Sequence, residues 1–336
     1  MNAAATTPPP CTIGVADITP EEADAVLDGA LVTDADVAVL DLNGPGALAC
    51  LQGMFTNDIE QAGEAGFVYG AVLTPKGMIV SDAWISRDGA KVRMFAPRDG
   101  LDALQAVFQR SLPPRLARVV DRSDDMEVLR LVGPRTHAVA ERAGVGLPAE
   151  GRTAVAIAGQ IACQVAVPEY GIPFELQLAV GRQDAPAIRD RLQLAGAVSG
   201  GAPAAELARI LAGWPRLGAE IDAKTLPQEV RFDEIGGVSY TKGCYVGQET
   251  VARLHFRGRP NRHLVGLVWH EPIDLNQSAV VQDNKPRGRV TSAAWLAPLE
   301  RYIGLGIVRR EVDGGRDVTA GGANAGVVDL PFALDE

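Results

Sequence analysis

Lys242-Gly243-Cys244-Tyr245-Val246-Gly247-Gln248-Glu249 is the stretch of this chain that says most about its fold. It places one thiol between two glycines, which can adopt φ > 0 and allow close approach of a backbone or a flat ligand. Lys242 supplies a positive charge that can lower the pKa of the thiol. An isolated cysteine is most often a small buried hydrophobe. Its charged and polar neighbours instead make this a candidate functional loop, with Cys244 and Lys242 as candidate catalytic residues.

The composition is that of a globular protein with two or three packed domains. The chain has 336 residues, of which 47% are hydrophobic and 22% charged. The net charge of -10 argues against broad binding of phosphate backbones, although a local basic patch stays open. Apolar runs fall short of the ~20 residues of a membrane span. Residues 1–10 lack the features of a secretory signal. We expect a tail and lead-in over 1–28 and a cytoplasmic protein.

The four cysteines are far apart, and none forms a C-x-x-C pair. This spacing excludes a recognisable zinc knuckle or a disulfide scaffold, and it fits a reducing compartment. The four histidines are too scattered for a histidine-rich site. We therefore predict no metal site within the chain.

A strand, a Gly-Pro turn and a helix follow one another twice. Val37–Leu42 leads into Gly44-Pro45, and Met126–Val132 leads into Gly133-Pro134. Proline suits a helix start, where the first N–H groups have no helical partner. The repeat predicts paired α/β units of ferredoxin-like design. A nominal dinucleotide fingerprint over 44–49 is discounted, because Pro45 removes a donor from the turn.

After His263 the character changes to short β-rich runs separated by turns, which predicts a small β-barrel. The predicted class is α+β. We place an α/β region over 29–255, divided into subdomains of about 29–122 and 123–255, and the barrel over 256–336. Further strands and helices of the α/β region are expected at 66–73, 78–86, 91–95, 100–108, 153–157, 161–167, 174–180, 184–195 and 203–212.

The quoted stretch resembles the signature of the YgfZ family, the folate-binding relatives of the glycine-cleavage T-protein. That signature reads K-G-C-[FY]-x-G-Q-E, and an Ala-Arg pair usually follows it, here Ala252-Arg253. The T-protein branch keeps the lysine and glycines but lacks the cysteine. Cys244 thus favours YgfZ over a true aminomethyltransferase.

The resemblance covers about residues 30–330. It is carried by segments that match the family at 51–58, 74–78, 169–175, 227–229 and 288–292. It implies a GcvT-like cloverleaf with a central hole, and tetrahydrofolate or a derivative bound in that hole. It also implies a role in iron–sulfur cluster assembly or repair, supporting iron–sulfur enzymes that include tRNA-modifying ones. The implied partners are assembly or client proteins. The acidic balance argues against direct nucleic-acid binding, and the short apolar runs argue against a membrane.

A reduced folate needs an acceptor for its pterin N–H groups and cations for its glutamyl carboxylates. Asp82 is the candidate acceptor, although an aspartate here can equally cap a turn. Arg253 and Arg257 are the candidate cations, although surface arginines are usually just solvated. The remaining candidate cofactor-binding residues are Tyr245, Gln248, Glu249 and Glu175, and Tyr170 is a candidate pocket residue.

Two positions depart from the family pattern. The T-protein has two adjacent aspartates after its central turn, one of them catalytic, where this chain has Ser81-Asp82. The family's Arg-x-Glu-Ala-Gly reads Arg209-Ile210-Leu211-Ala212-Gly213 here. Leu211 replaces a glutamate that contacts the pterin in some relatives. Both departures weaken an aminomethyltransferase interpretation.

Cys244 has three candidate roles: a nucleophile, a redox thiol, or a transient ligand of a cluster. A cluster needs about four ligands, so the last role requires a partner. A nucleophile needs a base, for which His255 is one candidate. Two rival functions stay open. One is a tetrahydrofolate-dependent aminomethyl or one-carbon transferase, and the other is an RNA-binding module built on the basic stretch 253–263.

Overall fold

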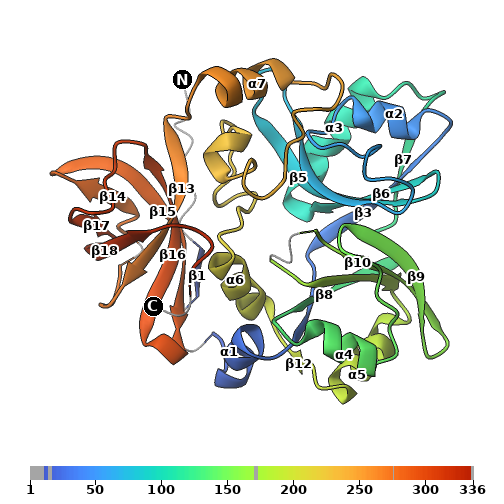
Figure 1. Ribbon diagram of the computed structural model, residues 1–336, viewed down its shortest axis with the longest axis horizontal. Coiled ribbons are helices and arrows are strands. Elements are labelled where there is room, and N and C mark those ends of the chain that lie inside the picture. Colours follow the sequence, from blue (N-terminus) through green and yellow to red (C-terminus); the bar gives the residue numbers. More distant parts are fainter. Residues whose placement is uncertain (1–10, 14–16, 170–172, 275, 334–336) are drawn as a thin grey trace.

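Three β-sheets surround helix α6 (Ala202–Leu211) and the coil that follows it (Figure 1). The computed structural model describes residues 11–13, 17–169, 173–274 and 276–333. One sheet forms a barrel, drawn in orange and red. The other two sheets form the α/β units on the opposite side of α6.

The first α/β unit is an antiparallel sheet of five strands in the order β4-β5-β6-β3-β7. Helices α2 and α3 pack on one face of it, around a core that includes Phe55 and Phe108. The Gly44-Pro45 turn connects β3 to α2 as predicted. The elements are β3 (Val37–Asn43), α2 (Ala47–Gln52), β4 (Phe67–Leu73), β5 (Ile79–Asp88), β6 (Lys91–Pro97), the 3-10 turn Arg98–Gly100, α3 (Leu101–Ser111) and β7 (Arg118–Asp121).

The second α/β unit has six strands in the order β12-β2-β8-β11-β10-β9. Strand β2 (Leu31–Asp34) pairs with β8, although it precedes β3 of the first sheet in sequence. The chain therefore crosses between the units just after Asp34. The other elements are α1 (Pro20–Leu27), β8 (Met126–Val132), α4 (Thr136–Arg142), β9 (Arg152–Ala158), β10 (Ile161–Val167), β11 (Leu176–Gly181), α5 (Ala185–Leu194) and β12 (Val198–Ser199).

The third sheet closes into a six-stranded barrel, because β15 pairs with both β14 and β16. The short strand β1 (Cys11–Ile13) adds to β15 in parallel. Trp269 is fully buried in the barrel core. The barrel strands are β13 (Arg262–Trp269), β14 (Ala279–Gln282), β15 (Lys285–Leu296), β16 (Arg301–Arg309), β17 (Val318–Ala320) and β18 (Ala323–Val328), with a 3-10 turn at Ala297–Leu299.

The predicted α+β class with a C-terminal barrel is confirmed. Helix α7 (Gln248–Arg257) links the signature to the barrel, so the predicted boundary at 255/256 falls in its last turn. The short strands β2, β7, β12 and β17 lie outside the strands that the sequence predicted. In the described part of the chain, no helix combines the length and apolar character that a membrane crossing requires.

Candidate functional site

A cavity of about 470 Å³ opens where the two α/β units meet α6 and the loop after it. This volume lies within the range of small-molecule sites. Its polar lining includes Asp82 of β5 and Arg130 of β8, and its aromatic lining includes Trp84 and Trp214. Asp82 and Trp84 belong to β5, Arg130 to β8, and Trp214 to the loop after α6. The cavity therefore forms only when these elements pack together.

Asp82 is the predicted residue that the structure places in this cavity. The Tyr69 hydroxyl donates a 2.9 Å hydrogen bond to its Oδ2, while its Oδ1 is buried without a partner among the described residues. Burial raises the pKa of Asp82 to about 6, against the lowering effects of the Tyr69 hydrogen bond and the Arg130 charge. The free oxygen is therefore an acceptor available to a ligand.

Aromatic rings form the wall around Asp82. The rings of Trp84 and Trp214 are nearly parallel, with centroids 5.9 Å apart and planes 11° apart. Tyr69 packs against both, at centroid distances of 5.2 Å and 4.7 Å. A flat heterocycle with N–H groups fits this combination of aromatic surface and a buried carboxylate. Asp82 and the two tryptophans are the residues that would hold the pterin of a folate.

Arg130 is a lining residue that sequence reasoning missed. Its guanidinium carbon lies 4.2 Å from the ring centroid of Phe174, and its Nε donates to Gln177 Oε1 at 3.3 Å. Burial lowers the pKa of Arg130 to about 10, although the charges of Asp82 and Tyr69 act in the opposite direction. The signal in the sequence was a single arginine inside the buried strand predicted at 126–132.

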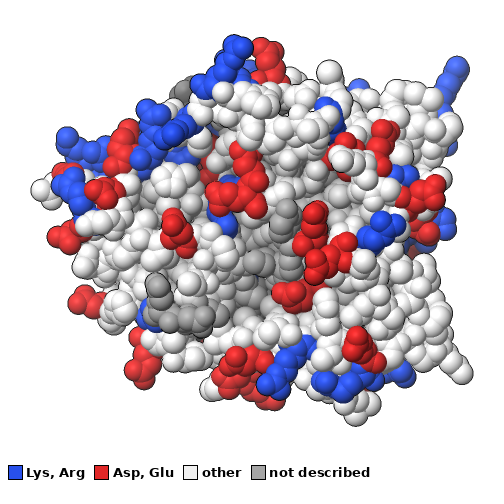
Figure 2. Space-filling view, in the orientation of Figure 1, with Lys and Arg blue, Asp and Glu red and all other residues white. Residues whose placement is uncertain are grey.

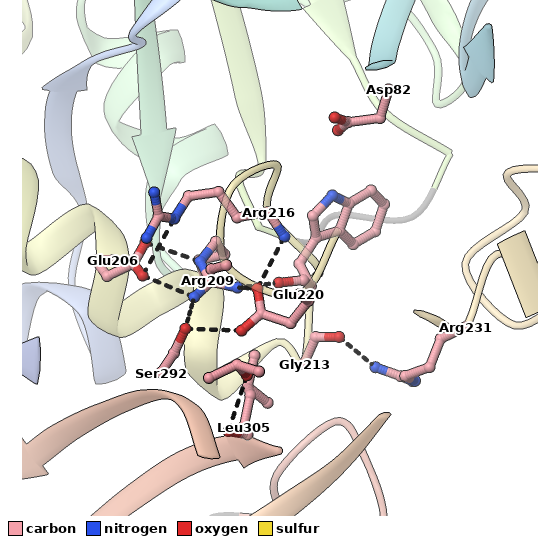
Figure 3. Close-up of polar contacts among 12 residues, drawn as sticks. Asp82, Glu206, Arg209, Gly213, Arg216, Glu220, Arg231, Ser292 and Leu305 are labelled. Atoms are coloured by element: carbon pink, nitrogen blue, oxygen red, sulfur yellow. Dashed lines mark hydrogen bonds and ion pairs between the residues drawn. The ribbon is translucent and has the colours of Figure 1, made fainter. Parts of the chain in front are cut away.

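A buried ion network joins the cavity wall to the barrel (Figure 3). Arg209 of α6 forms ion pairs with Glu206 at 2.7 Å and with Glu220 at 3.0 Å. Its Nη2 also donates to Ser292 Oγ of β15 at 2.7 Å, and that hydroxyl donates to Glu220 Oε1 at 2.7 Å. The network therefore connects α6, the loop after it and strand β15.

Lys242 of the signature is buried and engaged away from the thiol. Its Nζ donates hydrogen bonds of 2.7, 2.7 and 2.8 Å to the carbonyl oxygens of Gln52, Phe55 and Asn57. Burial lowers the pKa of Lys242 to about 8, while the charge of Asp58 favours the ammonium form. This geometry makes Lys242 an anchor of the loop.

Further contacts fix the signature loop on the first α/β unit. The N–H of Val246 donates to Gly53 O at 3.1 Å. Upstream, the Thr56 hydroxyl donates to Gly237 O at 2.6 Å, and the Asn57 amide donates to Gly236 O at 2.7 Å. The segment 51–58 thus contacts both the signature and the chain that leads into it.

Cys244 itself is exposed on this anchored loop. The structure separates it and its neighbours from the lining of the cavity, which contains Asp82 but none of the other predicted folate-binding residues, all of them described. Tyr245 is buried beside Lys242, whose Nζ lies 5.2 Å from the ring centroid. The predicted residues on α7, all outside the cavity lining, are Gln248, Glu249, Arg253 and Arg257.

Glu175 also lies outside the cavity lining, just before β11. Burial raises the pKa of Glu175, the positive charge of His137 lowers it, and the negative charge of Glu150 raises it. His137 lies on α4 and Glu150 just before β9, so the charges that act on Glu175 belong to the second α/β unit. Tyr170 lies outside the described residues.

His255, a candidate base, belongs to a polar cluster on the surface. Its Nδ1 lies 3.3 Å from Asp233 Oδ2, and its ring stacks on Tyr240 at a centroid distance of 3.6 Å. The Tyr240 hydroxyl donates to the other oxygen of Asp233 and accepts from Gln228 at 3.0 Å. The sequence did not predict this cluster, because its members are spread over residues 228–255. Within the described residues, no group of three or more His, Cys, Asp or Glu side chains is arranged to hold a metal ion.

Neither residue that departs from the family pattern is among those that line the cavity. Ser81 is fully buried, and a Cβ on Gly100 would lie 2.4 Å from its Oγ. Because side chains alternate along a strand, Ser81 faces away from the side that Asp82 occupies. Leu211 is absent from the lining, and its carbonyl accepts the Phe332 N–H at 3.0 Å. Neither residue therefore contributes to the cavity lining in this chain.

Comparison with known proteins agrees with this architecture. The model of the GCVT N-terminal domain matches residues 12–235, and that of the glycine cleavage T-protein C-terminal barrel domain matches residues 262–333. The crystal structure of the glycine cleavage system aminomethyltransferase T from Bartonella henselae superposes with a TM-score of 0.78. It shares 20% identity over 93% of this chain and 89% of that chain, so it supports the fold alone.

Two kinds of relative are similar in sequence. The tRNA-modifying protein YgfZ of Cronobacter sakazakii is 28% identical over 250 residues, 74% of each chain. An aminomethyltransferase of Prosthecochloris aestuarii is 27% identical over 290 residues, covering 80% of this chain and 76% of the relative. The predicted resemblance to YgfZ and the T-protein is confirmed. The chain belongs to the family that combines a GCVT N-terminal domain with a glycine cleavage T-protein C-terminal barrel, and the YgfZ proteins are among its relatives.

Proposed function

We propose that this protein binds a reduced folate in the cavity beside Asp82. The observation that carries the proposal is the free Oδ1 of Asp82, a buried carboxylate oxygen on a residue that lines a cavity of about 470 Å³, together with Trp84 and Trp214 in the same lining. A buried acceptor without a partner costs free energy unless a ligand supplies the donor. The N–H groups of a tetrahydropterin are such donors, and the GCVT-type fold supports this class of ligand.

Calorimetric titration with tetrahydrofolate under anaerobic conditions tests the proposal. The wild type is expected to show saturable binding, and Asp82→Asn is expected to bind at least about tenfold more weakly, because a hydrogen bond to a charged group is lost. Cys244→Ala should bind as the wild type does. An absence of saturable binding by the wild type would disprove the proposal.

We further propose that the bound folate serves a function in iron–sulfur cluster assembly or repair, in which Cys244 is the functional thiol. An exposed thiol on an anchored loop supports this role, as does the similarity to proteins named tRNA-modifying YgfZ. Clients would include iron–sulfur enzymes that modify tRNA, in the cytoplasm. Full recovery of iron–sulfur enzyme activity by Cys244→Ala in a deletion strain would refute the thiol's role.

A second candidate is a tetrahydrofolate-dependent aminomethyl or one-carbon transferase. One observation favours it: the pKa of Asp82, raised by burial to about 6, suits a carboxylate that exchanges a proton near neutral pH. An assay with aminomethyl donors and tetrahydrofolate distinguishes the two. Turnover that Asp82→Asn abolishes and Cys244→Ala preserves would establish the transferase.

A further inference from the structure

The cavity contains a second polar group whose hydrogen-bonding capacity is not met. Within the described part of the chain, Arg130 makes one side-chain hydrogen bond, from Nε to Gln177 Oε1 at 3.3 Å. Among the described residues, no carboxylate lies within ion-pair distance of its guanidinium. Arg130 is half-buried, and the negative charge of Asp82 acts on it without forming an ion pair. Its Nη groups are therefore donors available to a ligand in the cavity.

The position of Arg130 is fixed from two sides. Its guanidinium lies over Phe174, at 4.2 Å from the ring centroid, and Gln177 holds its Nε. Gln177 is buried on β11 and lies opposite Arg130 in the strand register. An arginine held in this way loses little further freedom when it binds an oxygen acceptor.

Asp82 and Arg130 give the cavity complementary halves. The free Oδ1 of Asp82 accepts hydrogen bonds, whereas the Nη groups of Arg130 donate them, and both residues line the same cavity. A ligand that matches both carries a donor and a carbonyl acceptor. The amide edge of a 4-oxo pterin has that pattern, with ring N–H groups beside the C4 oxygen.

We propose that Arg130 selects the 4-oxo pterin ring by donating to its C4 oxygen, while Asp82 accepts from its N–H groups. This inference rests on the proposed folate binding and adds the specificity of the site. It makes Arg130 a specificity-determining residue. A 4-amino ring places a donor where Arg130 needs an acceptor, so the site should reject it.

The test compares tetrahydrofolate with 4-amino-4-deoxytetrahydrofolate by anaerobic calorimetry at pH 7.5. The wild type is expected to prefer the 4-oxo ligand by roughly ten- to hundredfold. Arg130→Met should reduce this preference to near unity, and Arg130→Lys should retain part of it. Arg110→Met, an exposed arginine on α3, is the control for loss of charge and should behave as the wild type. Thermal unfolding checks that each variant is folded.

The outcomes separate the inference from the proposed function. A wild type that binds both ligands equally would overturn the role of Arg130 but not folate binding, whereas a wild type that binds neither contradicts folate binding itself. An Arg130→Met variant that weakens both ligands by the same factor indicates a structural arginine and overturns the inference. Binding of 6-methyltetrahydropterin, which lacks the glutamyl tail, should fall with Arg130→Met. If it does not fall, Arg130 contacts the tail and the inference is wrong.

Discussion

Lys242 and Cys244 are two residues apart in the signature, but their side chains have opposite environments. The lysine is buried and donates to three main-chain carbonyls, whereas the cysteine is exposed. The sequence suggested that the lysine acts on the thiol. The long lysine side chain instead reaches the carbonyls of the segment 51–58, which is distant in sequence. Its partners therefore depend on where that segment lies in the folded protein.

This contrast predicts different effects of substitution within one motif. Lys242→Met removes the donor of three main-chain carbonyls and should lower the free energy of unfolding by about 2–4 kcal/mol. Cys244→Ser changes an exposed atom and should change the free energy of unfolding by less than about 0.5 kcal/mol. Urea denaturation of the two variants measures both values. Equal stabilities would contradict the anchoring role of Lys242.

The raised pKa of Asp82 predicts a pH dependence of stability. Because the folded-state pKa of about 6 lies above the ordinary value of 3.8, the folded protein binds more protons than the unfolded chain between these values. The stabilising contribution of Asp82 is complete below about pH 3.8 and is lost as the pH rises through 6. At pH 7.5 the penalty is on the order of 3 kcal/mol.

Asp82→Asn should therefore be more stable than the wild type at pH 7.5, and this advantage should shrink as the pH falls toward 4. Urea denaturation of both proteins at pH 4.5, 6 and 7.5 measures their free energies of unfolding. The contributions of the other titrating groups cancel when the wild-type value is subtracted from that of the variant. A difference that does not change with pH would show that burial does not disfavour the Asp82 carboxylate.

At the scale of elements, the N-terminus of α7 meets the hairpin between β4 and β5. Gly247 has a φ of 84°, and a Cβ there would lie 2.6 Å from Thr74 O. The other signature glycine differs, because a Cβ on Gly243 would have no atom within 4 Å. One glycine therefore permits close packing of two elements, whereas the other has space for a side chain.

Gly247→Ala should reduce the free energy of unfolding by about 2–4 kcal/mol, from the strain of a positive φ and the clash with Thr74. Gly243→Ala is the matched control in the same motif and should stay within about 0.5 kcal/mol of the wild type. Chemical denaturation compares the two. A tolerated Gly247→Ala would mean that the hairpin tip moves freely relative to α7.

Sequence periodicity predicted the long strands and helices of the α/β units and the presence of a barrel. It missed β2 (Leu31–Asp34), which is short and obtains its pairing from β8, about a hundred residues later. The candidate site likewise contains one residue that the sequence predicted and one that it missed. Family motifs identified Asp82, but Arg130 lies outside them and becomes a cavity residue only through the packing of β8 against the first unit. Such long-range contacts have no local signal.

For the whole molecule, the ion network around Arg209 links α6, the loop after it and the barrel (Figure 3). In contrast, the face of the molecule in Figure 2 carries both acidic and basic side chains of the described residues on its surface. The Glu220 side chain is fully buried, and that of Arg209 is 7% exposed. Ion pairs of this kind contribute little net stability compared with apolar replacements, but removal of one partner leaves a buried charge.

Arg209→Met should therefore destabilise the protein by about 3–5 kcal/mol, because Glu220 loses its partner in a buried position. The barrel should also loosen from the α/β units, since Ser292 of β15 loses the donor that joins it to α6. Differential scanning calorimetry is expected to show the single transition of the wild type divide into two. The double variant Arg209→Met/Glu220→Met removes both charges and should recover part of the loss. A double variant less stable than Arg209→Met alone would show that the network contributes through packing, and the unpaired charge would not be the cause of the destabilisation.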